Sequence, residues 1–300
     1  MRVALIHNPK AGDELHGAEA LQRLLAGAGH DVAYRSIKEP GWEDALRDPG
    51  DLVVVAGGDG TVRKVFKKLA GSGITATLFP VGSANNVART LGLDGVEIAR
   101  LVESWSDARV VPFHLGEASA HWGESRFVES SGGGAFADVL ARAEDVDADD
   151  ADGEEKVDLG LQLLRDVIAE APSLVWTLEV DGVDLSGEFL AVEAMNVRET
   201  GPNVPLAPEA DPTDGRLDVV RVRPEDRAGL VAYVGQRLRG ERVSSPRLPV
   251  HRGTHVTIGP PRDRPFRVDD ELWDEPSTGG DGRAVIRAGR AAVDLLVSAG

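Results

Sequence analysis

The sequence predicts an α/β protein, in which a parallel-sheet domain is followed by a mainly antiparallel β-sandwich domain. Two observations lead to this class. As far as Trp105, apolar runs alternate with helical patterns, which is typical of a parallel sheet with helical crossovers. From Arg109 onward the apolar runs are short, often alternating, and separated by Gly, Pro and Asp, which is typical of antiparallel sheets.

Four strands and five helices are expected in the first part. The strands are placed at residues 2–7, 31–36, 51–56 and 76–81, and the helices at 17–28, 42–47, 62–69, 87–91 and 96–105. The second part is expected to hold strands at 109–115, 126–129, 174–180, 188–196, 217–222, 254–258, 266–268 and 291–297, and helices at 159–170 and 224–238. The acidic run 144–155 is interpreted as a solvated loop.

The segment Val53–Thr61 organises the first part, because a buried strand there runs directly into a glycine turn. Glycines adopt positive φ at little cost and allow backbone N–H groups to approach a ligand closely. The helix that follows offers free N–H groups and a dipole that favour an anion such as phosphate. Asp59 could hold Mg²⁺ or accept a proton, and Thr61 could bond a phosphate or cap the helix. The alternative is a plain tight turn with Asp59 or Thr61 as the helix N-cap.

Two further turns of small and polar residues follow predicted strands, at residues 8–12 and 82–86. All three turns then lie at the carboxyl ends of parallel strands, where open α/β sheets bind their ligands. Three such turns on one edge predict a shared ligand site.

Composition narrows the function classes. The formal net charge of −17 argues against broad nucleic-acid binding and against a polybasic membrane anchor. Cysteine is absent, so disulfides and thiolate chemistry are excluded. No apolar run reaches about 18 residues, and the first residues do not have the pattern of a signal peptide. We therefore expect a cytoplasmic protein without a transmembrane segment, peripheral to a membrane at most.

The motifs, taken in order, resemble the diacylglycerol kinase catalytic-domain family, which includes bacterial lipid kinases, sphingosine kinases and ceramide kinases. The matching segments are HNPKAG at 7–12, GGDGTV at 57–62, PVGSANNVARTLGL at 80–93, SGGGAFADV at 131–139, APEADPTDGRLDVV at 207–220 and VDDEL at 268–272. The resemblance implies an ATP-binding domain at residues 1–110, completed by about 290–300, and a β-rich substrate domain at 111–289, with the active site in the cleft between them. It implies transfer of the ATP γ-phosphoryl group to a lipid hydroxyl with Mg²⁺, on an acceptor at a membrane surface. The sequence leaves open whether the protein forms a homodimer.

The resemblance also implies site residues. Glu271 would be the general base, and Asp59 would lie close to Mg²⁺. The residues implied to line the nucleotide are Asn8, Lys10, Ser36, Gly57, Gly58, Asp59, Gly60, Thr61, Ser83, Asn85 and Asn86. A structural Mg²⁺ is implied at Asp214, with backbone groups of Asp211 and Arg216.

Three positions depart from the family pattern. Asn86 replaces an Asp, Asp270 replaces a Gly, and Gly201–Asn203 stands where many relatives have several glycines. Two alternatives remain. One is an NAD kinase, a related class that also carries GGDGT, and the other is a nucleotide- or lipid-binding protein without turnover. The sequence leaves the acceptor open among diacylglycerol, a sphingoid base, ceramide, phosphatidylglycerol and a soluble alcohol.

Overall fold

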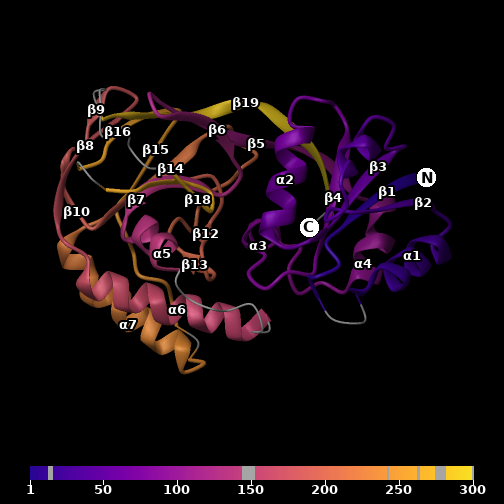
Figure 1. The fold of residues 1–300 in the computed structure, drawn as a ribbon, viewed down its shortest axis with the longest axis horizontal. Helices are drawn as coiled ribbons and strands as arrows, with labels where there is room; N and C mark the ends of the chain where they lie inside the picture. The colour runs from indigo at the N-terminus through magenta and orange to yellow at the C-terminus, as the bar shows by residue number, and fades with distance from the viewer. Residues whose placement is uncertain (13–15, 144–152, 242, 262–263, 274–281, 299–300) are drawn as a thin grey trace. The chain divides into compact units, whose positions relative to one another are not determined.

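The computed structural model describes residues 1–12, 16–143, 153–241, 243–261, 264–273 and 282–298 (Figure 1). The chain divides into two compact units, each described below by itself. The first unit comprises Met1–Leu115 and Arg290–Gly300, and the second comprises Gly116–Gly289. Two long strands, β5 (Arg109–Ala120) and β19 (Ala284–Val297), contribute residues to both units.

A parallel sheet forms the centre of the first unit, in the order β2-β1-β3-β4-β19. Its first four strands are β1 (Arg2–His7), β2 (Asp31–Ser36), β3 (Leu52–Gly57) and β4 (Thr75–Pro80). The last part of β19 joins the edge of the sheet, where Leu295 lies opposite Ala76. Every residue of β3 is buried, as expected for a central parallel strand that is covered on both faces.

Helices cover both faces of this sheet (Figure 1). They are α1 (Ala18–Gly27), η2 (Trp42–Leu46), α2 (Asp59–Leu69), α3 (Asn86–Thr90), α4 (Ile98–Glu103) and η3 (Ser104–Ser106). Helix α2 buries Val62, Val65, Phe66 and Leu69, which recur at the spacing of one helical face. It begins at Asp59, three residues earlier than predicted, so that Asp59 and Gly60 belong to its first turn.

The second unit contains a six-stranded antiparallel sheet in the order β15-β14-β11-β7-β17-β18. Its strands are β7 (Ser130–Gly134), β11 (Ala191–Met195), β14 (Leu217–Val222), β15 (Val250–Gly253), β17 (Phe266–Val268) and β18 (Glu271–Trp273). The other strands are β6 (Gly123–Phe127), β8 (Leu174–Val180), β9 (Val183–Asp184), β10 (Gly187–Phe189), β12 (Glu199–Thr200), β13 (Val204–Pro205) and β16 (His255–Gly259). The predicted fold class is confirmed.

Helices α5 (Ala135–Ala143), α6 (Gly153–Glu170) and α7 (Arg227–Leu238) form a further layer of this unit, with the short η4 (Pro224–Asp226) before α7. Side chains of β11 alternate between two cores. Ala191 and Met195 face the helices, whereas Val192 and Ala194 face the strands that include β8 and β16. Successive side chains of a strand point to opposite faces, so a strand that is buried on both faces contributes alternately to two cores.

Several elements of the second unit were not predicted, namely the strands β7, β9, β12, β13, β15 and β18 and the helix α5. Of the acidic run at 144–155, residues 144–152 lie outside the described residues, and 153–155 form the first turn of α6. Within the described ranges, no helix has both the length and the apolar character needed to cross a membrane.

Candidate active site

Three turns meet at the carboxyl edge of the first unit's sheet, as the strand pattern predicts. The Asn8 N–H donates to the carbonyl of Ala56, at 2.9 Å, which connects the first turn to the end of β3. The second and third turns touch through their backbones, because a Cβ built on Gly82 would lie 2.2 Å from Gly58 Cα. A Cβ on Gly12 would lie 3.3 Å from Val81 Cβ, so the first and third turns also approach each other.

Gly57, Gly58 and Gly82 are required for close approach and not for positive φ, which corrects part of the sequence interpretation. Among the glycines of the three turns, Gly12 adopts positive φ, whereas Gly57, Gly58, Gly60 and Gly82 do not. A Cβ on Gly57 would lie 2.5 Å from Thr61 Oγ1. At Gly57, Gly58 and Gly82 the neighbouring atoms leave little or no space for a side chain, and the backbones of the two turns lie close together at the sheet edge.

The Asp59 carboxylate accepts hydrogen bonds from the start of the neighbouring helix α3. Its Oδ2 accepts from Asn86 N–H at 3.0 Å, and its Oδ1 accepts from Val87 N–H at 3.1 Å. The N-cap of α2 is Gly58, without a side-chain capping bond, so neither Asp59 nor Thr61 caps that helix. Asp59 instead joins the second turn to the third.

Burial raises the pKa of Asp59 above its usual value, and the negative charge of Asp94 adds to this. The two N–H groups from α3 act in the opposite direction. A carboxylate has about four lone-pair positions. The two bonds to α3 therefore leave Asp59 the capacity to bind a cation, and a cation would favour its ionised form.

Asn85 stabilises the third turn from within. Its Nδ2 donates to the Gly82 carbonyl at 2.9 Å and to Asp94 Oδ1 at 3.1 Å, while its Oδ1 accepts from Gly82 N–H at 3.0 Å. Its φ of 54° lies in the left-handed region, which Asn tolerates better than most residues. The side chain of Asn85, which was predicted to line the nucleotide, thus holds the loop in shape. Asn86, the next residue, is buried and is the first residue of α3.

The other predicted nucleotide residues lie on the same edge. Ser36 is the last residue of β2, is buried, and accepts a hydrogen bond from Lys38 N–H through its Oγ. Lys10 and Ser83 are exposed in the first and third turns. The structure therefore brings the predicted nucleotide-binding residues to the carboxyl ends of β1, β2, β3 and β4.

We expect Gly82→Ala to weaken ATP binding at least tenfold and to lower the melting temperature by about 2–6 °C. The added methyl group would sit 2.8 Å from Gly58 N and from Asn85 Oδ1, so the two turns must separate. Binding measured by calorimetry and melting measured by circular dichroism check this. Gly27→Ala is the matched control, since nothing lies within 4 Å of a Cβ at that helical position. ATP affinity unchanged in Gly82→Ala would contradict the convergence of the turns on a ligand.

The predicted general base, Glu271, lies in the second unit at the start of β18, where it is exposed. Strands β17 and β18 form a hairpin in which Val268 lies opposite Glu271. In the loop between them the positive φ, 56°, falls on Asp269. Asp270 is therefore not in the conformation that favours glycine, and its replacement of the family's Gly introduces no such backbone strain.

Asp269 attaches this hairpin to the rest of the unit. It is 3% exposed, and its Oδ1 accepts from the N–H groups of Val128 and Glu129 at 3.0 and 2.9 Å. Its own N–H donates to the carbonyl of Ser130 at 2.9 Å. The position of Glu271 thus depends on a carboxylate two residues before it.

A buried ion pair between β17 of this hairpin and β11 was not predicted. Arg267 donates to both carboxylate oxygens of Glu193, at 3.0 and 2.9 Å, and to the hydroxyls of Ser130 and Thr200 at 2.6 and 2.9 Å. Burial raises the pKa of Glu193, and Arg267 acts against that shift. The only signal in the sequence is an Arg in the centre of the short apolar strand 266–268.

The predicted metal residues are elsewhere in the second unit, in the loop before β14. Asp214 Oδ1 accepts from Arg216 N–H at 2.8 Å, and Asp214 Oδ2 accepts from the guanidinium of Arg252. In the order of the six-stranded sheet, β14 is separated from β18 by β11, β7 and β17. Nothing in the sheet pairing brings these residues next to Glu271.

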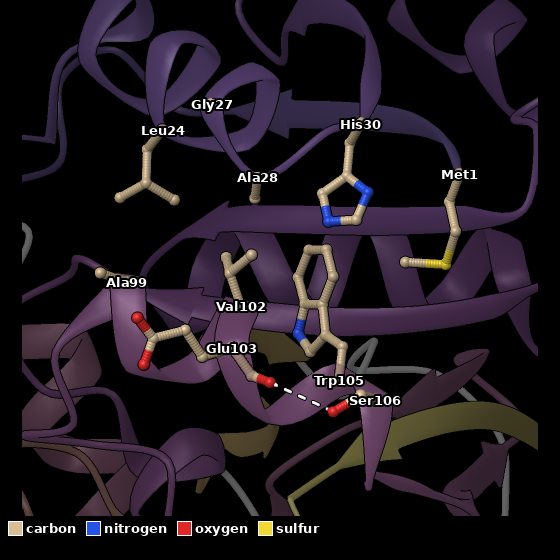
Figure 2. Close-up of a pocket in the computed structure, with 10 residues that line it drawn as sticks. All are labelled: Met1, Leu24, Gly27, Ala28, His30, Ala99, Val102, Glu103, Trp105 and Ser106. Atoms are coloured by element: carbon tan, nitrogen blue, oxygen red, sulfur yellow. Dashed lines mark hydrogen bonds between the residues drawn. The ribbon is translucent and has the colours of Figure 1, made fainter.

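A pocket of about 630 Å³ lies elsewhere in the first unit, and Figure 2 shows the residues that line it. His30 lies against Trp105 there, with 5.2 Å between the ring centroids. Met1 and His30 precede β1 and β2, so the pocket is at the amino ends of the strands, the opposite edge from the three turns. None of the predicted site residues lines it.

Comparisons with known proteins match both parts of the chain. Residues 2–118 match the model of the diacylglycerol kinase catalytic domain, and residues 136–284 match that of the YegS C-terminal NAD kinase beta sandwich-like domain. The chain is 26% identical over 285 residues to a diacylglycerol kinase of Bacillus subtilis (strain 168), covering 90% of this chain and 89% of that protein. It is 32% identical over 239 residues to a Pseudomonas aeruginosa PAO1 protein named "Probable lipid kinase YegS-like", covering 75% and 73%.

Among solved structures, the fold is similar to that of a diacylglycerol kinase from Bacillus anthracis str. Sterne. The TM-score is 0.68 at 20% identity, and the match covers 99% of this chain and 97% of the other. At this identity the likeness shows the fold alone.

Proposed function

The chain belongs to the diacylglycerol kinase and YegS-like lipid kinase family, whose members are phosphotransferases, and we propose that it transfers the γ-phosphoryl group of ATP to a lipid hydroxyl. The observation that carries this proposal is the backbone contact between the second and third turns. A Cβ on Gly82 would lie 2.2 Å from Gly58 Cα, and the second turn leads into the N-terminus of α2. Backbone N–H groups at such an edge suit the phosphates of a nucleotide.

In this proposal the residues at the sheet edge bind and orient ATP. The turn Gly57–Thr61 receives the phosphates, and Lys10 supplies a positive charge from the first turn. Asn85 and Asp59 hold the third turn in place, so that the backbone groups need no rearrangement when the nucleotide arrives. Mg²⁺, when bound, would neutralise phosphate charge, and Asp59 is the carboxylate that would hold it.

Glu271 is proposed as the general base that accepts the proton of the acceptor hydroxyl. An exposed carboxylate on a hairpin held by the buried Asp269 is accessible to a substrate and limited in its movement. Phosphoryl transfer depends mainly on positioning and charge neutralisation, so one carboxylate suffices for the proton. The lipid acceptor at a membrane surface and the homodimer remain predictions.

Phosphoryl transfer from radiolabelled ATP tests the proposal directly. We expect a labelled phospholipid when the enzyme is offered mixed vesicles of diacylglycerol, sphingoid base, ceramide and phosphatidylglycerol with Mg²⁺. NAD is the control acceptor, because formation of NADP would show the alternative kinase class. ATP binding in calorimetry without label in any acceptor would contradict the proposal and identify a binding protein.

A further inference from the structure

Four acidic residues gather where the chain enters β14. They are Glu209, Asp211, Asp214 and Asp218. Asp218 is only 2% exposed. A buried carboxylate in this environment needs a cation nearby to stay ionised.

Arg252 supplies a positive charge at this place. Strands β14 and β15 pair in a register that sets Arg252 directly opposite Asp218. Its Nε lies 3.5 Å from Asp218 Oδ2, and its Nη2 donates to Asp214 Oδ2. One guanidinium thus joins a carboxylate of the strand to a carboxylate of the preceding loop, which its planar fork of donors permits.

This arrangement does not fit the structural Mg²⁺ that the family resemblance implies at Asp214. Mg²⁺ requires nearly octahedral oxygen ligands at about 2.0–2.1 Å. Of the two Asp214 oxygens, one accepts from Arg216 N–H and the other from the guanidinium of Arg252. A guanidinium remains charged at any ordinary pH, so it would repel a divalent ion bound to the same carboxylate.

We propose that Arg252 is the permanent cation of this cluster, a guanidinium in place of a structural Mg²⁺. The second unit then keeps its fold without a divalent ion. The inference concerns the loop before β14 and stands whether or not the chain is a kinase.

The test compares melting in EDTA with melting in millimolar MgCl₂, without nucleotide and with KCl at matched ionic strength. The wild-type melting temperature is expected to differ by less than about 1 °C between the two buffers. Arg252→Gln is expected to melt roughly 5–10 °C lower in EDTA, because it leaves Asp218 buried without its counter-charge. Mg²⁺ should restore part of that loss, since the vacated position beside Asp214 becomes attractive to a cation.

Two further variants keep the outcome decisive. Arg247→Gln, an exposed arginine of the same segment, should melt like the wild type in both buffers. Should Arg252→Gln fail to fold, Arg252→Lys retains the charge and is expected to melt independently of Mg²⁺. Either of two results would overturn the proposal. One is a wild-type melting temperature that rises with Mg²⁺ and loses that rise in Asp214→Asn, and the other is an Mg²⁺-dependent Arg252→Lys.

Discussion

Glu271→Gln is expected to lower kcat for phosphoryl transfer by about 10²–10⁴-fold, the usual contribution of a general base. Glutamine keeps the size and polarity of the side chain but cannot accept the proton of the acceptor hydroxyl. Because Glu271 is exposed on β18, the substitution should leave the melting temperature and the ATP affinity unchanged. Single-turnover rates with saturating ATP and lipid measure the effect on the chemical step.

Glu179→Gln is the matched control for this prediction. It removes an exposed glutamate from β8, a strand of the same unit, and should retain full activity. Activity of Glu271→Gln within a few-fold of wild type would remove this residue from the mechanism and leave the ATP site of the first unit as a separate question.

The second large effect concerns stability. Glu193→Gln is expected to reduce the free energy of unfolding by about 3–5 kcal/mol, because it leaves the Arg267 guanidinium buried without its partner. At pH 5, Arg267→Met should cost less, since a carboxyl that loses its partner can take up a proton and a guanidinium cannot. Urea unfolding followed by circular dichroism gives both values. The double variant Glu193→Leu/Arg267→Met should be more stable than Glu193→Gln, since no buried charge then remains.

The difference in unfolding free energy between wild type and Arg267→Met should grow as the pH rises. Burial already raises the pKa of Glu193, and removing Arg267 takes away the charge that opposes this shift. The folded variant then holds a proton that the unfolded chain releases above its pKa of about 4.3. Stability relative to wild type therefore falls as pH rises above that value, by up to about 1.4 kcal/mol per pH unit. A deficit that is smaller at pH 8 than at pH 5 would contradict this account.

Much of the fold could be predicted from local patterns. Strands β8, β14 and β17 have the predicted bounds, and β1 and β2 do as well. Runs of apolar residues with a regular period, bounded by Gly, Pro and Asp, specify such elements whatever their neighbours are. The three turns at the edge of the first sheet were predicted for the same reason, because a turn of small and polar residues after a buried strand is visible in a few consecutive letters.

Strand β7 shows where local reasoning fails. Its five residues, Ser-Ser-Gly-Gly-Gly, have low strand propensity, yet all are buried between β11 and β17. A Cβ on Gly132 would lie 2.1 Å from the Val192 carbonyl oxygen, and a Cβ on Gly133 would lie 3.0 Å from the Trp176 ring. The glycines are needed because neighbours distant in the chain leave no room for side chains, which no local pattern encodes.

By itself, then, the sequence determined the α/β class, the change to antiparallel strands after residue 109, and the turns at one edge of the first sheet. Only the tertiary structure decided what the charged residues of those segments contact. Asp59 bonds the start of α3, Arg267 bonds Glu193, and Arg252 joins Asp214 to Asp218. The physical reason is that secondary structure follows from the periodicity of adjacent residues, whereas the partner of a charge is set by the pairing of strands and loops far apart in the chain.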